Sequence, residues 1–418
     1  MSKPSSVAPP DERVLLQGGD VFDGSGSVPQ RADVVIAGGR IVDVGLGLDG
    51  DVAIDVTGST VLPGIIDCHV HVTASGVDVM ERLAQPFSYQ FFAAARNLEA
   101  TLATGVTTVR DAGGADLGIQ QAVADGLIPG PQLLLAINII GQTGGHTDGW
   151  FSSGFKVPLS LPHPGRPDGI ADGVDELRKV VRQMLRAGAD VIKICTTGGV
   201  LSPRDNPTHT QFSPEEIAVV VAEAAAAGRV VMAHAQGTAG IKNAIHAGVR
   251  SIEHGIYLDD EAIELMLSHG TWLVPTLVAP RAVIAAAAAG AQLPAAVVAK
   301  AIEVADIHVA SVRSAVAAGV KLAMGTDSGV GPHGHNLDEL ILMEQCGMSS
   351  AEVLAAATSG SAKLCGLQDI TGRVAPGLAA DLVVVDGDAR ELNTLRDRIQ
   401  QVWQQGQLVV DGVQSAHV

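Results

Sequence analysis

Short apolar segments alternate with alanine-rich helical patterns through the middle of this 418-residue chain. Such alternation predicts βα units on a parallel sheet. We count eight candidate strands, at residues 64–71, 107–112, 132–140, 189–196, 230–234, 251–254, 271–276 and 321–326. Eight such units predict an α/β fold of the (β/α)8 TIM-barrel type, in which residues at the carboxyl ends of the strands form the site.

The two ends of the chain follow a different, β-type pattern. Short apolar segments separated by Gly-rich or Asp-rich turns fill residues 14–61, and the same pattern returns between residues 380 and 412. We therefore predict one small β-sandwich domain assembled from both ends of the chain. Its parts would span 1–61 and 374–418, on either side of a barrel domain at 62–373.

The charge balance limits the possible partners. The chain has 45 acidic and 27 basic residues, so its formal net charge is -18, and this opposes binding to DNA, RNA or an anionic membrane. Hydrophobic residues make up 47% of the chain and charged residues 17%, which is typical of a large packed α/β protein. We expect a small-molecule substrate, and the apolar content also allows a homo-oligomer.

Targeting signals and cysteine spacing bear on the cellular compartment. Residues 1–13 are polar and proline-rich, without an apolar signal core. The stretch 282–299 is mostly alanine and is interrupted by Gln292 and Pro294, so it predicts a pair of surface helices rather than a membrane span. The four cysteines lack CxxC spacing, so neither a disulfide framework nor a thiolate zinc site is indicated. A reducing cytoplasm fits best.

Polar residues gather where the predicted strands end. His69 and His71 end the first strand, and their i, i+2 spacing directs both imidazoles to one side. Taken alone, this His-x-His pattern fits either a metal site or ordinary hydrogen-bonded or surface histidines. Later strand ends carry Arg110 with Asp111, Lys193, His234, His254 and Asp327. Because these strand ends would share one mouth of the barrel, we expect a single polar cluster there.

Lys193 lies inside an otherwise apolar strand, and two explanations remain open for it. Burying an ammonium group costs free energy unless the group is paired or neutralised. An ion pair with a carboxylate such as Asp111 is one solution. Alternatively, desolvation lowers the pKa of the amine, which then adds carbon dioxide to form a carbamate ligand between two metal ions.

Several motifs together resemble a known family. They are Gly-Ile-Ile-Asp-Cys-His-Val-His at 64–71, Ile-Lys-Ile at 192–194, Ala-His-Ala at 233–235, Ser-Ile-Glu-His-Gly at 251–255, Gly-Thr-Asp-Ser at 325–328 and the tail at 372–382. In this order they resemble the amidohydrolase superfamily, and more narrowly its prolidase-like and imidazolonepropionase-like metal-dependent hydrolases. The resemblance spans nearly the whole chain.

The resemblance implies a binuclear centre with two divalent metal ions, zinc first among the candidates. One ion would take His69, His71 and Asp327, and the other His234 and His254. A hydroxide and a carbon dioxide-derived carbamate on Lys193 would bridge the two ions. Two cations lower the pKa of the bridging water, and Asp327 would take its proton and pass it to the leaving nitrogen.

Other residues receive supporting roles. The glycine-rich loop 141–149 contains His146, which resembles a family position that donates to the substrate carbonyl or its oxyanion. Arg204 and His333 lie in loops after predicted strands and are candidates for binding substrate, although a solvated loop is an equally ordinary explanation. Asp67 and Glu253 adjoin ligands, so each is a candidate acceptor for the second nitrogen of a metal-bound imidazole.

Gln236 is the main departure from the family pattern. Prolidase-like relatives usually carry His-Ala-Tyr here, and the tyrosine helps to hold a substrate carboxylate, whereas this chain has His234-Ala235-Gln236. Glutamine donates a hydrogen bond but is shorter and lacks the aromatic face. The leading substrates are Xaa-Pro dipeptides or N-acyl amino acids, and aryl ureas, carbamates or aryl amides are the alternative.

Two further functions fit the motifs less well. A catalytically inactive amidohydrolase-like scaffold would lose ligands, but all six positions are present here. Deaminases of this fold generally use one metal and lack the bridging lysine. Hydrolysis of an amide-type C–N bond therefore remains the leading prediction.

Overall fold

The computed structural model describes residues 12–151 and 153–412. These residues form two compact units. The first holds the described chain up to Ile66, the segment Leu102–Thr108 and the described chain from Ser349 onward. The second holds Asp67–Thr101 and Val109–Met348.

The first unit is built on one sheet. Its strands are β1 (Val14–Val21), β2 (Gln30–Ala37), β3 (Arg40–Gly45), β4 (Val52–Asp55), β5 (Ser59–Pro63), β14 (Leu382–Asp386), β15 (Ile399–Gln404) and β16 (Gln407–Asp411). The order is β16-β15-β14-β5-β1-β2-β3, with β4 beside β1. Because β14 pairs antiparallel with β5, strands from the two ends of the chain lie in one sheet.

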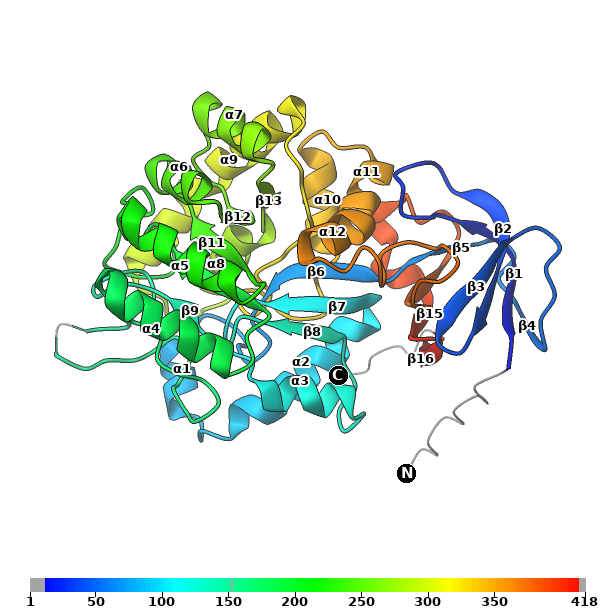
Figure 1. Ribbon diagram of the computed structural model, residues 1–418, viewed down its shortest axis with the longest axis horizontal. Helices are drawn as coiled ribbons and strands as arrows, with labels where there is room; N and C mark the ends of the chain where they lie inside the picture. Colours follow the sequence, from blue (N-terminus) through cyan, green and yellow to red (C-terminus); the bar gives the residue numbers. More distant parts are fainter. Residues whose placement is uncertain (1–11, 152, 413–418) are drawn as a thin grey trace. The chain divides into compact units, whose positions relative to one another are not determined.

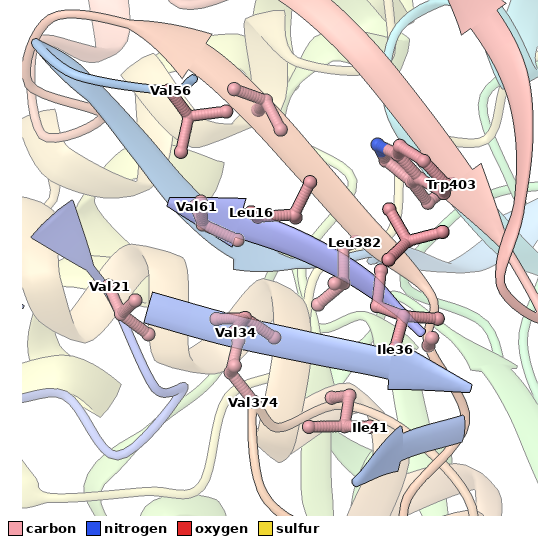
Figure 2. Close-up of a cluster of buried hydrophobic side chains, with 13 residues drawn as sticks. Leu16, Val21, Val34, Ile36, Ile41, Val56, Val61, Val374, Leu382 and Trp403 are labelled. Carbon is pink, nitrogen blue, oxygen red and sulfur yellow. The ribbon is translucent and has the colours of Figure 1, made fainter. Parts of the chain in front are cut away.

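Apolar side chains from both ends of the chain form the core of this unit. Figure 2 shows Leu16 and Val34 from neighbouring strands close to Leu382 and Trp403 from the C-terminal strands. Leu16 lies directly opposite Val34 in the register of β1 and β2. The Trp403 indole N–H donates to the Gln401 side-chain oxygen at 3.1 Å, so the one polar atom that this ring brings into the cluster is satisfied.

The second unit contains a parallel sheet. Its strands are β9 (Ile139–Ile140), β10 (Val191–Cys195), β11 (Val230–Ala235), β12 (Ser251–His254) and β13 (Trp272–Val274), in the order β13-β12-β11-β10-β9. Each neighbouring pair in it is parallel. A three-stranded sheet contains β6 (Ile65–Val70), β7 (Val106–Asp111) and β8 (Gln132–Leu135). The predicted α/β fold with parallel strands is therefore confirmed.

The predicted strand at 321–326 has no regular ladder. It forms isolated parallel bridges instead, between Leu273 and Leu322 and between Val70 and Ser328. In the same stretch the Cys68 N–H donates to the Met324 carbonyl at 2.9 Å. Asp327 has φ of 59°, in the left-handed region, so the extended conformation cannot continue through it. The segment nevertheless connects β13 to β6 by backbone hydrogen bonds.

Helices follow most strands of the second unit. They are α1 (Val79–Ala84), α2 (Tyr89–Ala103), α3 (Leu117–Ala124), α4 (Gly173–Arg186), α5 (Pro214–Ala226), α6 (Thr238–Ala247), α7 (Asp260–His269), α8 (Val278–Ala288), α9 (Ala295–Ala318) and α10 (Asp338–Gln345). Figure 1 shows α4 to α7 in green, arranged in succession around β9 to β12. Local signals set their ends: Ser213 and Glu216 form a capping box at the start of α5, and Gly248 ends α6 in the left-handed conformation.

The remaining short helices belong to the first unit. They are α11 (Ser350–Ala355), η1 (Ala356–Gly360), α12 (Ser361–Cys365), η2 (Leu392–Thr394) and η3 (Arg396–Arg398). Residues 282–288 belong to α8 and 295–299 to α9, so the stretch forms a pair of helices as predicted. Pro294 is the N-cap of the second helix. None of the described helices is long and apolar enough to cross a membrane.

Candidate metal centre

The six predicted ligands lie on strands of the second unit or directly after them. His69 is on β6, Lys193 on β10, His234 on β11 and His254 at the end of β12. Strand register brings them together, because Cys195 on β10 pairs with His234, and the next residue on β11 pairs with His254. His71 and Asp327 immediately follow β6 and the bridging segment.

Short distances show that the six side chains form one cluster. Asp327 Oδ1 lies 3.2 Å from His71 Nε2 and 3.5 Å from His69 Nε2. Lys193 Nζ lies 3.4 Å from the same His69 nitrogen. One donor atom each from His69, His254 and Asp327 lies within 4.8 Å of the others. The rings of His234 and His254 are 4.7 Å apart between centroids, so the sixth side chain joins the group.

Hydrogen bonds orient the histidine rings toward this cluster. The Nδ1–H of His69 donates to Glu253 at 2.8 Å, and that of His71 donates to the Gly113 carbonyl at 2.7 Å. His254 Nδ1 hydrogen-bonds with Thr276 Oγ1 at 2.7 Å. These three rings therefore keep Nε2 for a metal. In His234 the arrangement is reversed, because its Nε2 contacts the Gly198 carbonyl at 3.0 Å and Nδ1 is left for a ligand.

Glu253 is held by a buried ion pair. Arg110, which is 2% exposed, donates to Glu253 Oε1 at 3.1 Å and to the Cys68 carbonyl at 2.6 Å. Ser251 donates to the same carboxylate through a short hydrogen bond. Glu253 thus has the position predicted for it, accepting the second nitrogen of a candidate ligand, and Arg110 compensates its charge.

The buried Lys193 is not paired with Asp111. That carboxylate accepts the backbone N–H groups of Val72, Gly113 and Ala115 at 2.8, 3.0 and 3.1 Å. Within the described residues, no carboxylate forms an ion pair with Lys193. Burial lowers the pKa of its amine. A buried amine with a lowered pKa, beside imidazole and carboxylate groups, is suited to become a ligand rather than an ion-pair partner.

Asp67 acts on the backbone rather than on an imidazole. It accepts hydrogen bonds from the His69 N–H at 3.1 Å, from Thr326 Oγ1 at 2.7 Å and from Asn336 Nδ2 at 2.8 Å. Burial raises the pKa of this carboxyl to about 6. The predicted contact with a ligand's second ring nitrogen is therefore replaced by contacts that join β6 to the segment around Asp327.

His146 lies beside the cluster. Its ring stacks on His234 with 4.4 Å between centroids and an interplanar angle of 20°. Its Nδ1 lies 2.8 Å from Ser202 Oγ and 3.2 Å from Asp205 Oδ2. The loop histidine is therefore fixed against a candidate ligand.

A cavity of about 820 Å³ opens at these side chains and lies wholly within the second unit. Arg204 and Gln236 line it. The Arg204 guanidinium stacks 5.0 Å from the ring centroid of Trp150, and the Gln236 side-chain oxygen is buried without a hydrogen-bond partner among the described residues. His333 does not line this cavity, because its Nε2 lies 3.1 Å from the Ala74 carbonyl and its Nδ1 3.5 Å from Thr101 Oγ1.

Several supporting residues carried no signal in the sequence. They are Ser202, Asp205, Thr276, Lys300 and Asn336, together with the pairing of Arg110 and Glu253. Their partners lie far away along the chain: Asp205 is 59 positions from His146, and Glu253 is 143 positions from Arg110. Arg110 itself is among the strand-end residues predicted for the polar cluster, but its pairing with Glu253 has no sequence signal.

The donor set fits divalent metal ions. Imidazole nitrogen and carboxylate oxygen suit zinc and its neighbours, and metal ions bind the neutral form of imidazole. Burial holds the pKa values of His69, His234 and His254 well below the usual range, which favours that neutral form. Burial raises the pKa of Asp327, but its interactions with His69 and His71 lower the pKa by more than burial raises it, so the carboxylate stays ionised.

Comparisons with known proteins agree with this geometry. The sequence model of the Amidohydrolase family matches residues 60–413. Ochratoxinase from Aspergillus niger is 34% identical over 434 aligned residues, covering 97% of this chain and 89% of the ochratoxinase.

Two solved structures are similar over almost all of both chains. One is a Xaa-Pro dipeptidase with methionine in its active site, which is 35% identical with a TM-score of 0.87 and covers 96% of this chain and 100% of its own. The other is a prolidase complexed with N-methylphosphonate-L-proline, which is 38% identical with a TM-score of 0.88 at the same coverage.

Proposed function

This chain belongs to the amidohydrolase family, and from that premise we propose that it is a metal-dependent hydrolase of amide-type C–N bonds acting on Xaa-Pro dipeptides or N-acyl amino acids. The observation that carries the proposal is the cluster of His69, His254 and Asp327 donor atoms within 4.8 Å, with Lys193 buried against it. Hydrolysis of amide C–N bonds follows from the family and from its ochratoxinase and prolidase members.

Two divalent ions, zinc first among them, would be held by six residues of this chain. His69, His71 and Asp327 would bind one ion, His234 and His254 the other, and Lys193 would bridge them as its carbamate. When bound, such ions lower the pKa of water to near neutrality and polarise the substrate carbonyl. The donor chemistry described above supports this assignment.

The protein's own groups would position substrate and carry protons. Asp327 is ionised and next to the ligand histidines, so its carboxylate is placed to accept the proton of the attacking water and return it to the leaving nitrogen. His146 would contact the substrate at the edge of the cavity. Arg204 and Gln236 would bind other substrate groups, and their place in the cavity lining supports this role.

We also propose a closed barrel, a β-sandwich and the boundaries of the domains. The bridges at Leu322 and Ser328 support a closed (β/α)8 barrel in which 321–328 serves as the eighth strand. The sheet shared by both chain ends and its apolar core support a β-sandwich. We propose domain boundaries at 1–61, 62–373 and 374–418. A cytoplasmic location and a homo-oligomer remain predictions.

A second candidate function is hydrolysis of aryl ureas, carbamates or aryl amides. Two observations favour it. Gln236 lacks the hydroxyl and the ring of the tyrosine expected to hold a carboxylate, and the cavity lining includes Trp150 and Phe151, which suit an aryl group.

A substrate screen separates the two candidates. Protein purified without chelators and reconstituted with zinc and bicarbonate would be assayed with Xaa-Pro dipeptides, N-acyl amino acids, phenylureas and aryl carbamates. Turnover of the amino-acid amides supports the first function. Turnover only of ureas or carbamates replaces it with the second, and absence of turnover throughout contradicts both.

A further inference from the structure

The His146 ring is held by two close neighbours. His234 stacks on the ring, and the Gly199 backbone approaches it closely. A Cβ atom at Gly199 would lie only 2.2 Å from His146 Cε1 and 2.6 Å from both ring nitrogens. The ring therefore occupies the space that any larger residue at 199 would need, and this close approach fixes its plane.

Hydrogen bonds at one edge fix the rotation of the ring within that plane. Ser202 Oγ donates to Asp205 Oδ1 in a short hydrogen bond, and the Gly199 N–H donates to Asp205 Oδ2 at 3.0 Å. Because the Ser202 proton is already used, Ser202 Oγ can only accept from His146 Nδ1.

The ionisation of Asp205 also indicates that the proton lies on His146 Nδ1. Burial raises the pKa of this carboxyl, but the hydrogen bond and charge of His146 and the hydrogen bond of Ser202 lower it to about 2. An ionised carboxylate has no proton to donate, so a proton between Asp205 Oδ2 and His146 must belong to Nδ1.

Lys300 of α9 fixes the loop that supplies these groups. Its ammonium donates to the carbonyls of Gly199 and Ser202 at 2.6 Å each and to that of Asp205 at 3.2 Å. It also lies 3.5 Å from Asp205 Oδ1. The Lys300 ammonium thus binds three backbone carbonyls and one carboxylate of this loop. These contacts fix the position of Asp205.

The other ring nitrogen is left for the cavity. His146 lines it, and Nε2 has no hydrogen-bond partner among the described residues. We propose that Asp205 is a positioning residue that holds the proton of His146 on Nδ1, so that Nε2 offers its lone pair to a substrate N–H group rather than donating to the carbonyl oxygen. Lys300 holds Asp205 in place. This role rests on the proposed amide hydrolysis, because His146 matters only if substrate binds beside the metal centre.

A kinetic cycle tests the coupling. Asp205→Ala should lower kcat by roughly 10- to 100-fold with little change in KM, and Asp205→Glu, which keeps a carboxylate, should recover part of the loss. In a His146→Ala background the Asp205→Ala change should cost less than about twofold, because the residue it positions is absent. Lys242→Met is a control for breaking an ion pair outside the cavity. Lys242 pairs with Asp259 and Glu261 there, so this change should leave kcat unaltered.

A second measurement does not depend on activity. Nitrogen-15 NMR of histidine-labelled full-length protein, with His146 assigned from the His146→Ala spectrum, reports which ring nitrogen carries the proton. The proposal predicts Nδ1–H in the wild type, and loss of this preference in Asp205→Ala. A wild-type Nε2–H tautomer, or full additivity in the kinetic cycle, would overturn it. If the zinc-loaded wild type hydrolyses no amide, the proposed function fails, while the spectrum still decides the position of the proton.

Discussion

The aliphatic cluster of the first unit and the polar cluster of the second unit are buried equally well but have opposite chemistry. In the first unit Leu16 is 0% exposed within an aliphatic cluster, whereas in the second unit Lys193 is 2% exposed among histidines and carboxylates. Burying an aliphatic side chain stabilises the fold, whereas burying an ammonium costs free energy unless a partner compensates for it. The first interior is therefore explained by stability alone, and the second requires a function.

The carboxylates near the candidate metal centre show how the free-energy cost of burying a charge is limited. Glu253 is compensated by Arg110, and Asp67 accepts four hydrogen bonds, from the His69 N–H, from the N–H and hydroxyl of Thr326, and from Asn336. Lys193 lacks such a carboxylate partner among the described residues, so metal binding through its carbamate is the compensation that we propose. The following substitutions test this contrast, from the largest expected effect to the smallest.

Lys193→Ala should separate function from stability most clearly. We expect kcat to fall by about 1000-fold or more, which corresponds to about 4 kcal/mol of barrier, together with loss of one metal equivalent. In metal-free protein the thermal midpoint should stay the same or rise, because an unpaired buried amine is removed. Steady-state kinetics and calorimetry measure both, and retained activity with a single metal would contradict the binuclear assignment.

Glu253→Gln should reduce stability and metal binding together. It leaves Arg110 buried without its counter-charge, which costs about 3–5 kcal/mol of unfolding free energy. Denaturant unfolding measures the loss. The matched control is Glu223→Gln, which removes a partly exposed ion partner of Arg178 and Arg182 and should cost much less. Equal losses of unfolding free energy in the two variants would show that the buried Arg110–Glu253 pair stabilises the fold no more than a surface ion pair does.

Leu16→Ala should affect stability alone. Removing this side chain leaves a cavity in the aliphatic cluster, and we expect a loss of about 3 kcal/mol of unfolding free energy. Metal content and kcat of the folded fraction should be unchanged. Leu46→Ala, at a residue that is 71% exposed, is the control and should change stability by less than about 0.5 kcal/mol. A fall in metal content in Leu16→Ala would show that the two interiors are coupled.

Thr276→Val should give the smallest effect. It removes the hydroxyl that hydrogen-bonds with His254 Nδ1, and we expect metal affinity to fall about tenfold with little change in stability. Competition with a chelator of known affinity measures this. Thr358→Val, which loses a buried hydroxyl bonded to the Leu354 carbonyl, is the control. An identical affinity for both variants would mean that Thr276 does not orient His254.

The sequence predicts the parts of this site that depend on local pattern. Parallel strands end at one edge of a sheet, so His69, Lys193, His234 and His254 could be assigned to one cluster from the positions of their strands. Residues whose roles depend on distant loops could not be found in this way. Asp205 and Lys300 belong to a loop and a helix whose only connection to His146 is three-dimensional packing.

Two further differences have physical reasons. The strand predicted at 321–326 has the right apolar composition, but it forms isolated bridges at Leu322 and Ser328 instead of a ladder, and the backbone turns left-handed at Asp327, which composition does not encode. His333 lies in a loop after a predicted strand and is predicted to bind substrate, but in the fold it contacts the Ala74 carbonyl. A pattern of residue types does not specify which side of a loop faces the cavity.

The metal content of the wild-type protein tests the central claim most directly. Full-length protein would be purified without chelators, reconstituted with zinc and bicarbonate, freed of excess metal and examined by elemental analysis beside Lys193→Ala. The account predicts about two metal ions per wild-type chain and about one in the variant. Absence of bound metal in the wild type, or two ions in both proteins, would contradict it.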